Sequence, residues 1–210
     1  MTDERKRVVA SGYDAIADRY LDWNAQIDDQ ARTRLVGEFT DRLAPGSTVL
    51  DLGCGAGLAS TRALAERFAV TGVDISPRQI AAARLNVPSA TFILGDLAEV
   101  AFADGSFDGV TALYSISHVP REEHADLFRR IAGWLRPDGL FLAALGALDS
   151  PDWTGDWLST PMFFSSFDAD TNRQLVIDAG FDLPVAAVID TPEPEGPVPF
   201  LWVLGRRRRS

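Results

Sequence analysis

Thiol and imidazole side chains are scarce in this chain: Cys54 is the only cysteine, and His118 and His124 are the only histidines. One cysteine cannot form an intramolecular disulfide, and two histidines without a second thiol do not make a typical zinc ligand set. We therefore expect neither a disulfide scaffold nor a metal site. His124 lies beside two glutamates and is predicted to face solvent.

Long hydrophobic runs are missing as well. The longest strongly apolar stretch, Leu140 to Leu148, is far shorter than the roughly 20 residues that a membrane-spanning helix requires. The charged residues 1–7 contain no apolar segment of the kind found in signal peptides. These features predict a cytoplasmic protein without a membrane partner.

Positive charge is in deficit, because 30 acidic residues stand against 20 basic ones and give a net charge of −10. Such a surface repels phosphate backbones, so the charge favours a small-molecule partner over a nucleic acid. Four of the basic residues form the run Arg206 to Arg209, and residues 206–210 are predicted to be a solvated basic tail.

What the chain contains is an alternation of short apolar runs with amphipathic stretches. Seven runs have strand length, and most are nearly continuously apolar, which indicates strands covered on both faces: 48–50, 69–73, 91–94, 107–113, 140–145, 185–189 and 199–204. Helical patterns accompany them at 28–43, 58–68, 77–85, 122–135 and 169–179. Because the loop between the last two runs is too short for a helix, those runs are predicted to form an antiparallel hairpin.

This order predicts an α/β fold, a Rossmann-like doubly wound, mostly parallel seven-stranded sheet with an antiparallel C-terminal hairpin. The whole chain, 1–210, is expected to form one domain. Within it we expect N-terminal helices in 1–43, a cofactor-binding core in 48–145 and a lid in 146–168.

The first strand ends in three alternating glycines, in the segment Asp51-Leu52-Gly53-Cys54-Gly55-Ala56-Gly57. A glycine turn between a buried strand and a helix lets a ligand approach backbone amides and the positive helix end. The dinucleotide pattern needs a further glycine where Leu58 stands, which disfavours a nicotinamide cofactor. The alternative is a tight turn that binds no ligand.

This segment resembles the first motif of the class I S-adenosylmethionine-dependent methyltransferases, and the rest of the chain resembles that family in order, from about Tyr13 to about Leu204. The resemblance implies S-adenosyl-L-methionine as cofactor and methyl transfer to a small molecule by in-line displacement. It also implies that the following residues of the turn lie at the cofactor: Asp51, Gly53, Cys54, Gly55 and Gly57.

Two further strands end in acids. Asp74 lies 21 residues after Gly53 and resembles the family's acid that holds both ribose hydroxyls, while Asp96 resembles the acid that binds the adenine amino group. The resemblance places neighbouring residues at the cofactor too: Ile75, Gly95 and Leu97. The alternatives are a helix-capping acid at the first position and an ordinary Gly-Asp turn at the second.

The N-terminal segment and the fourth strand complete the predicted site. Ser11 is the expected N-cap of a helix that carries Tyr13 and Tyr20 on one face. These tyrosines resemble those that close over the cofactor in small-molecule methyltransferases; the alternative is an amphipathic helix that only packs its aromatic residues on the sheet. The resemblance also places Leu113 and Tyr114, at the end of the fourth strand, at the cofactor, in a segment that lacks the Asn/Asp-Pro-Pro-Tyr/Phe signature of nucleic-acid enzymes. His118 follows, as a general base for the acceptor or as a residue that only fixes the loop.

The connection 146–168 is rich in aromatic residues and too long for a simple turn. Trp153, Trp157 and Phe163 are predicted to line the acceptor pocket, with a satellite core or a dimer contact as the alternative. The favoured function is a small-molecule methyltransferase. The alternatives are a nicotinamide-dependent oxidoreductase and a non-catalytic S-adenosylmethionine-binding module.

Overall fold

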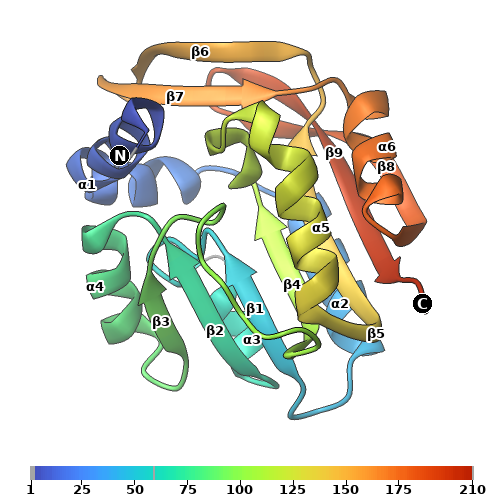
Figure 1. Cartoon of the computed structure of the whole chain (residues 1–210). Helices are drawn as coiled ribbons and strands as arrows, with labels where there is room; N and C mark the ends of the chain where they lie inside the picture. The colour runs from blue at the N-terminus through green and yellow to red at the C-terminus, as the bar shows by residue number, and fades with distance from the viewer. Residues whose placement is uncertain (1–2, 59, 210) are drawn as a thin grey trace.

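The computed structural model describes residues 3–58 and 60–209 of the chain. Seven of its strands form one sheet in the order β3-β2-β1-β4-β5-β9-β8, as Figure 1 shows. Neighbouring strands among β1 to β5 pair in parallel, and β9 pairs antiparallel with both β5 and β8. The predicted fold, including the antiparallel C-terminal hairpin, is confirmed. The strands of this sheet are β1 (Thr48–Leu52), β2 (Ala69–Asp74), β3 (Thr91–Leu94), β4 (Phe107–Leu113), β5 (Leu135–Gly146), β8 (Phe181–Glu193) and β9 (Gly196–Arg207).

Helices cover both faces of the sheet, with α5 and α6 on one face and α2 and α3 on the other (Figure 1). Each face is sealed by its own buried cluster, around Phe128 and Phe141 on the first and around Phe39 and Trp202 on the second. The strands are apolar on both faces because both faces are covered. The α-helices are α1 (Glu4–Asn24), α2 (Gln30–Arg42), α3 (Thr61–Ala65), α4 (Pro77–Asn86), α5 (His124–Trp134) and α6 (Ala169–Asp178).

The helix starts show how local chemistry sets the ends of the elements. Ser76 caps α4 as its sequence predicts, with its Oγ accepting from the Gln79 amide at 3.1 Å. The prediction of Ser11 as an N-cap is wrong, because α1 begins two turns earlier, where Asp3 accepts from the Arg5 amide at 2.9 Å. Ser11 lies inside the helix, and its hydroxyl donates to the Arg7 carbonyl.

The segment predicted as a lid is a hairpin of β6 (Ser150–Trp157) and β7 (Thr160–Ser166) that crosses one end of the sheet (Figure 1). Its turn residues, Leu158 and Ser159, both have positive φ, 49° and 58°, as tight hairpin turns between twisted strands require. Neither is a usual residue for that turn, so no hairpin could be predicted from the local pattern. Met162 and Phe163 of β7 pack against α1, so the hairpin and the N-terminal helix form one packed unit.

One surface prediction is wrong, and a second holds only in part. His124 is 1% exposed, and its Nε2 bonds to the Val119 carbonyl at 2.9 Å, because the first residue of α5 faces the core while the two preceding glutamates do not. In the run 206–210, Arg206, Arg208 and Arg209 are exposed as predicted, but the described residues do not form a free tail. Arg207 ends β9 and donates to the Leu135 carbonyl, while Arg208 and Arg209 form ion pairs with Asp182 and Asp138. No helix within the described residues is long and apolar enough to cross a membrane.

Candidate functional site

The glycine turn after β1 has a backbone that only glycine adopts easily. Gly53, Gly55 and Gly57 all have positive φ, at 80°, 53° and 77°. A Cβ on Gly53 would lie 2.2 Å from the Cβ of Ser115, whose hydroxyl donates to the Leu52 carbonyl at 2.7 Å. The turn therefore packs directly against the end of β4 and leaves no space for a side chain at Gly53.

Asp74, at the carboxyl end of β2, is bound to this turn. One carboxylate oxygen accepts from the Gly55 amide and the other from the Ser76 amide, both at 2.9 Å. The side chain is buried, and this burial raises the pKa of Asp74 to about 6 against the lowering effect of those amides. Because each oxygen has a second lone pair, the carboxylate can still accept bonds from a ligand.

Asp51, unlike Asp74, uses both carboxylate oxygens for hydrogen bonds to side chains of the protein. Its two oxygens accept from the hydroxyls of Thr61 at 2.6 Å and Thr111 at 2.7 Å, and the carboxyl group is buried. These bonds tie β1 to β4 and to the start of α3, so they hold the glycine turn in place. Burial raises the pKa of Asp51 above its usual range.

Two cavities adjoin the turn at the carboxyl ends of the parallel strands, the edge at which open α/β sheets bind ligands. The glycine-loop cavity, of about 80 Å³, is lined by ten of the residues predicted for the cofactor: Tyr13, Tyr20, Gly53, Gly55, Asp74, Ile75, Asp96, Leu97, Leu113 and Tyr114. The Arg32 cavity, of about 60 Å³, shares Gly53 and Gly55 with it and is also lined by Asp51, Cys54 and Arg32. Gly57 and Gly95 line neither cavity.

Two buried polar residues of the glycine-loop cavity, Gln79 and Lys6, are not predicted from the sequence. Gln79 is 1% exposed and its Nε2 has no hydrogen-bond partner within the described residues, so a buried donor stands at the cavity unpaired. Lys6, the only lysine of the chain, is 5% exposed and lies 2.8 Å from Asp96 Oδ2 and 2.7 Å from Glu123 Oε2. Lys6 thus ties α1 to the loop after β3. The sequence could have indicated only Gln79, because it lies in the first turn of the helix that follows Asp74; no local pattern indicates Lys6.

His118 stands between the glycine-loop cavity and a third, larger cavity, and lines both. Its Nδ1 lies 2.8 Å from the Phe163 carbonyl and its Nε2 lies 2.8 Å from the Tyr13 hydroxyl. A carbonyl only accepts, so Nδ1 carries the proton and Nε2 accepts from Tyr13. Burial lowers the pKa of His118 to about 4, which keeps the ring neutral near pH 7.

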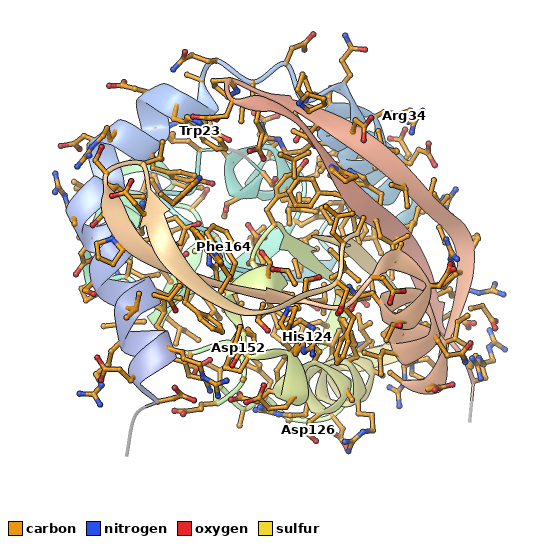
Figure 2. The ribbon with its side chains drawn as sticks, turned by 90° about the horizontal axis from the view of Figure 1, so that it is seen from above. Trp23, Arg34, His124, Asp126, Asp152 and Phe164 are labelled. Atoms are coloured by element: carbon orange, nitrogen blue, oxygen red, sulfur yellow. The ribbon has the colours of Figure 1, made fainter. Side chains whose placement is uncertain are left out.

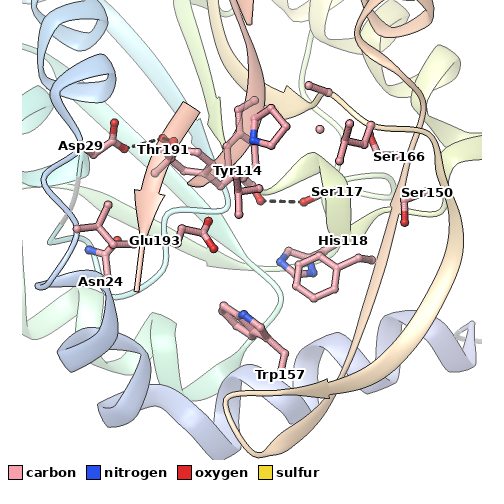
Figure 3. A pocket seen from close by; sticks show the side chains of 18 of the residues that line it. Asn24, Asp29, Tyr114, Ser117, His118, Ser150, Trp157, Ser166, Thr191 and Glu193 are labelled. Carbon is pink, nitrogen blue, oxygen red and sulfur yellow. Dashed lines mark hydrogen bonds between the residues drawn. The ribbon is translucent and has the colours of Figure 1, made fainter. Parts of the chain in front are cut away.

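The third cavity, here the aromatic cavity, has a volume of about 250 Å³ and lies between α1, the hairpin and the end of the sheet. Figure 3 shows Trp157, His118, Tyr114 and Glu193 around it. The aromatic cavity and the glycine-loop cavity share four lining residues, Tyr13, Tyr20, Tyr114 and His118. Groups bound in the two cavities would therefore meet at this shared wall.

Of the three aromatic residues predicted for an acceptor, only Trp157 lines the aromatic cavity. Phe163 is 1% exposed and packs in the cluster of α1, while its neighbour Phe164 faces the cavity, because successive side chains of a strand point to opposite faces. Trp153 is 45% exposed on the hairpin. Seen from above, Phe164 lies nearer the middle of the molecule than Trp23 of α1, which also lines the cavity (Figure 2).

The described part of the chain contains no group of three or more His, Cys, Asp or Glu side chains placed to hold a metal ion. Its polar groups suit a different ligand. Backbone amides, a buried carboxylate and an unpaired amide donor in the glycine-loop cavity can bind hydroxyl and amino groups, and Arg32 can bind a carboxylate.

Comparisons with known proteins agree with these features. Residues 49–139 match the family model described as a methyltransferase domain. The chain is 31% identical over 134 residues to an uncharacterized methyltransferase of Synechocystis sp., covering 64% of this chain and 62% of that protein. It is 35% identical over 161 residues to 27-O-demethylrifamycin SV methyltransferase of Amycolatopsis mediterranei, covering 66% and 58%. This chain therefore spans less than two thirds of the length of these relatives.

Among solved structures, the chain is similar to the 1,6-didemethyltoxoflavin-N1-methyltransferase of Burkholderia thailandensis, which was solved with 1,6-didemethyltoxoflavin and S-adenosylhomocysteine bound. The TM-score is 0.75, with 21% identity over 98% of this chain and 90% of that one. This likeness shows that the two chains share their fold.

Proposed function

We propose that the chain is a class I S-adenosylmethionine-dependent methyltransferase, and that it transfers a methyl group from S-adenosylmethionine to a small molecule bound in the aromatic cavity. The match of residues 49–139 to a methyltransferase domain and the identity with other methyltransferases support this proposal. The single observation that carries the proposal is the shared wall of Tyr13, Tyr20, Tyr114 and His118 between the glycine-loop cavity and the aromatic cavity. This wall is where a methyl donor and its acceptor would come together. The net charge of −10 favours a small molecule over a nucleic acid as acceptor.

The residues at the glycine turn fit the cofactor. Asp74 would accept the ribose hydroxyls with the lone pairs that the backbone amides leave open, and the unpaired Gln79 amide would donate to an oxygen of the nucleoside. Asp96 lies in the same cavity, beside Lys6, and would bind the adenine amino group. Arg32, the basic residue of the Arg32 cavity, would bind the cofactor's carboxylate.

When bound, S-adenosylmethionine would supply an activated methyl group, which passes in line to an acceptor atom while S-adenosylhomocysteine leaves. The protein then has to align the two molecules and exclude water from the sulfonium. The tyrosines of α1 and the aromatic residues of the hairpin are placed for that task, because they cover the cavities from one side. No charged catalytic group is required for the displacement itself.

We propose a positioning role for His118, rather than the general base that is the other hypothesis from its sequence position. Both ring nitrogens already have partners, and burial lowers its pKa to about 4, which makes the ring a weak base near pH 7. Bonded between the Phe163 carbonyl and the Tyr13 hydroxyl, the ring fixes α1 against β7 at the shared wall. We also propose that the protein acts in the cytoplasm, where its single cysteine would remain a thiol.

Calorimetric titration with S-adenosylmethionine, S-adenosylhomocysteine and NADH tests the cofactor. We expect the first two to bind and NADH not to bind. Binding of NADH alone would support the oxidoreductase alternative and overturn the proposal. A methyl-transfer assay with a radioactive methyl donor and a library of small aromatic acceptors distinguishes an enzyme from a non-catalytic binding module.

A further inference from the structure

We propose that the molecule taken up by the aromatic cavity is a small aromatic compound carrying a protonated amine, and that Glu193 binds this amine. The inference deepens the proposed function and rests on it, because it names the chemical class of the acceptor. Glu193 is the last residue of β8, from the C-terminal hairpin of the sheet, and Figure 3 shows its carboxyl group pointing into the pocket toward the side on which His118 lies.

The charges around the cavity point to a cation. No lysine or arginine is among the residues that line it, whereas two carboxylates are, Asp29 and Glu193. Asp29 is already satisfied, since it accepts from the Tyr114 hydroxyl at 2.5 Å and pairs with Arg32 at 3.4 Å. The backbone of Glu193 pairs with Gly196 in the strand ladder, but its side chain has neither a hydrogen bond nor an ion pair within residues 3–58 and 60–209. It is the available acceptor of the cavity.

Glu193 is also placed where a charge is costly without a partner. The side chain is half-buried, and burial together with the nearby Glu195 raises the pKa of Glu193 to about 7. Glu195 itself is exposed and accepts from the Trp23 indole nitrogen at 3.1 Å. A cationic ligand would offset the cost of the unpaired carboxylate, which an anionic ligand would increase.

Aromatic rings surround the same space. Trp157 lies 5.4 Å from Trp23, 5.9 Å from Tyr20 and 5.7 Å from Phe164, measured between ring centroids. Glu193 lines the same cavity as these four rings. Aromatic faces attract cations and stack on planar ligands, so these rings complete a site for an aromatic compound that carries an ammonium group.

The size of the cavity and the state of His118 restrict the ligand further. A volume of about 250 Å³ lies just below the range of roughly 300–1,000 Å³ that drug-sized ligands occupy, so a one- or two-ring molecule fits. His118 is neutral near pH 7 because burial lowers its pKa to about 4, so it offers no positive charge to an anion. A carboxylate ligand would find no basic partner in this cavity.

Three indoles that differ in the charge of their side chain test the inference: tryptamine, which is cationic, tryptophol, which is neutral, and indole-3-acetate, which is anionic. Each is titrated calorimetrically into the full chain, with and without S-adenosylhomocysteine. We expect tryptamine to bind at least tenfold more tightly than tryptophol, and indole-3-acetate to bind most weakly. Equal binding of tryptamine and tryptophol, or tighter binding of indole-3-acetate, would overturn the inference.

Two variants with the same change of charge identify the group responsible. Glu193→Gln should reduce tryptamine affinity at least tenfold, to the level of tryptophol, while tryptophol binds as before. Glu195→Gln, which removes an exposed carboxylate two residues away, should keep the preference for tryptamine. A preference that survives Glu193→Gln, or that disappears equally in Glu195→Gln, would show that Glu193 does not bind the amine.

The same titrations separate this inference from the proposed function. Failure of S-adenosylhomocysteine to bind would contradict the proposed methyl transfer, while the order of the three indoles in its absence would still report on Glu193. Conversely, normal binding of S-adenosylhomocysteine with no preference among the indoles would leave the methyltransferase proposal standing and refute the inference about the acceptor.

Discussion

The pKa of Asp74 makes cofactor binding depend on pH. In the free protein this pKa is raised to about 6, mainly by burial, whereas bonds from ribose hydroxyls favour the charged carboxylate. If only the ionised form binds well, the competent fraction is about one tenth at a pH one unit below the pKa, and the apparent affinity falls with it. S-adenosylhomocysteine should therefore bind about tenfold more weakly at about pH 5 than at about pH 7.5.

Stability of the unliganded protein should change in the opposite direction. The pKa of Asp74 in the folded state, about 6, lies above the ordinary value of 3.8 that an aspartate has in an unfolded chain. The contribution of this group to stability is therefore fully present below about pH 4 and is lost as pH rises through about 6. A shift of that size corresponds to about 3 kcal/mol in the free energy of unfolding. Bound cofactor should recover part of this loss, because it provides donors for the carboxylate.

Calorimetry at several pH values between about 5 and 7.5, in buffers of different ionisation enthalpy, measures both the affinity and the protons released on binding. Asp74→Ala should bind more than tenfold more weakly at pH 7.5 and should lose the pH dependence. Glu193→Gln should keep it, since Glu193 lines the aromatic cavity and not the glycine-loop cavity. An affinity of the wild-type protein that is constant over this range, or a slope that persists in Asp74→Ala, would refute the assignment of Asp74 to the ribose.

Four further substitutions test other parts of the structure. Gly53→Ala places a Cβ 2.2 Å from that of Ser115 at a positive φ, so thermal denaturation should show a loss of about 2 kcal/mol or more, and an unchanged Tm would contradict the tight turn. Lys6→Met leaves two acids near α1 without their cation and should destabilise the fold by about 3 kcal/mol in urea unfolding; full stability would show that the ion pairs contribute nothing. Trp157→Ala should raise the acceptor KM while S-adenosylhomocysteine binds normally, and loss of cofactor binding instead would remove Trp157 from the acceptor site. His118→Ala should lower kcat less than about tenfold and keep the shape of the pH-rate profile; a loss of roughly 10²- to 10⁴-fold with a missing limb would identify a general base instead.

The cofactor half of the candidate site could be predicted from the sequence because its signals are local. A glycine turn follows β1, and an acid ends β2 within one strand–helix–strand unit, so Gly53 and Asp74 lie in one short segment of the chain. Parallel strands end at the same edge of a sheet, which brings such turns together whatever the surrounding sequence. The hydrogen bond from the Gly55 amide to Asp74 is the result.

The local sequence pattern could not predict which face of β7 lines the aromatic cavity. Phe163 and Phe164 are adjacent and alike in composition, and only the pairing of β7 with β6 turns Phe164 toward His118 and Phe163 toward α1. A shift of one residue would exchange the two faces, since side chains of a strand alternate. The sequence therefore predicts aromatic residues over the site but not their assignment.

The sequence by itself determined the order of the elements, the glycine turn and the acids at the strand ends, because each depends on residues within one structural unit. Only the tertiary structure decided what surrounds them. Lys6 meets Asp96, Tyr13 meets His118, and Glu193 enters the aromatic cavity through the antiparallel return of β8 and β9. The first two pairs lie about 90 or more positions apart, and the hairpin that carries Glu193 joins the sheet only because β9 pairs with the distant strand β5. The partners, burial and pKa values of these groups therefore follow from the topology and from desolvation, which no local pattern in the chain encodes.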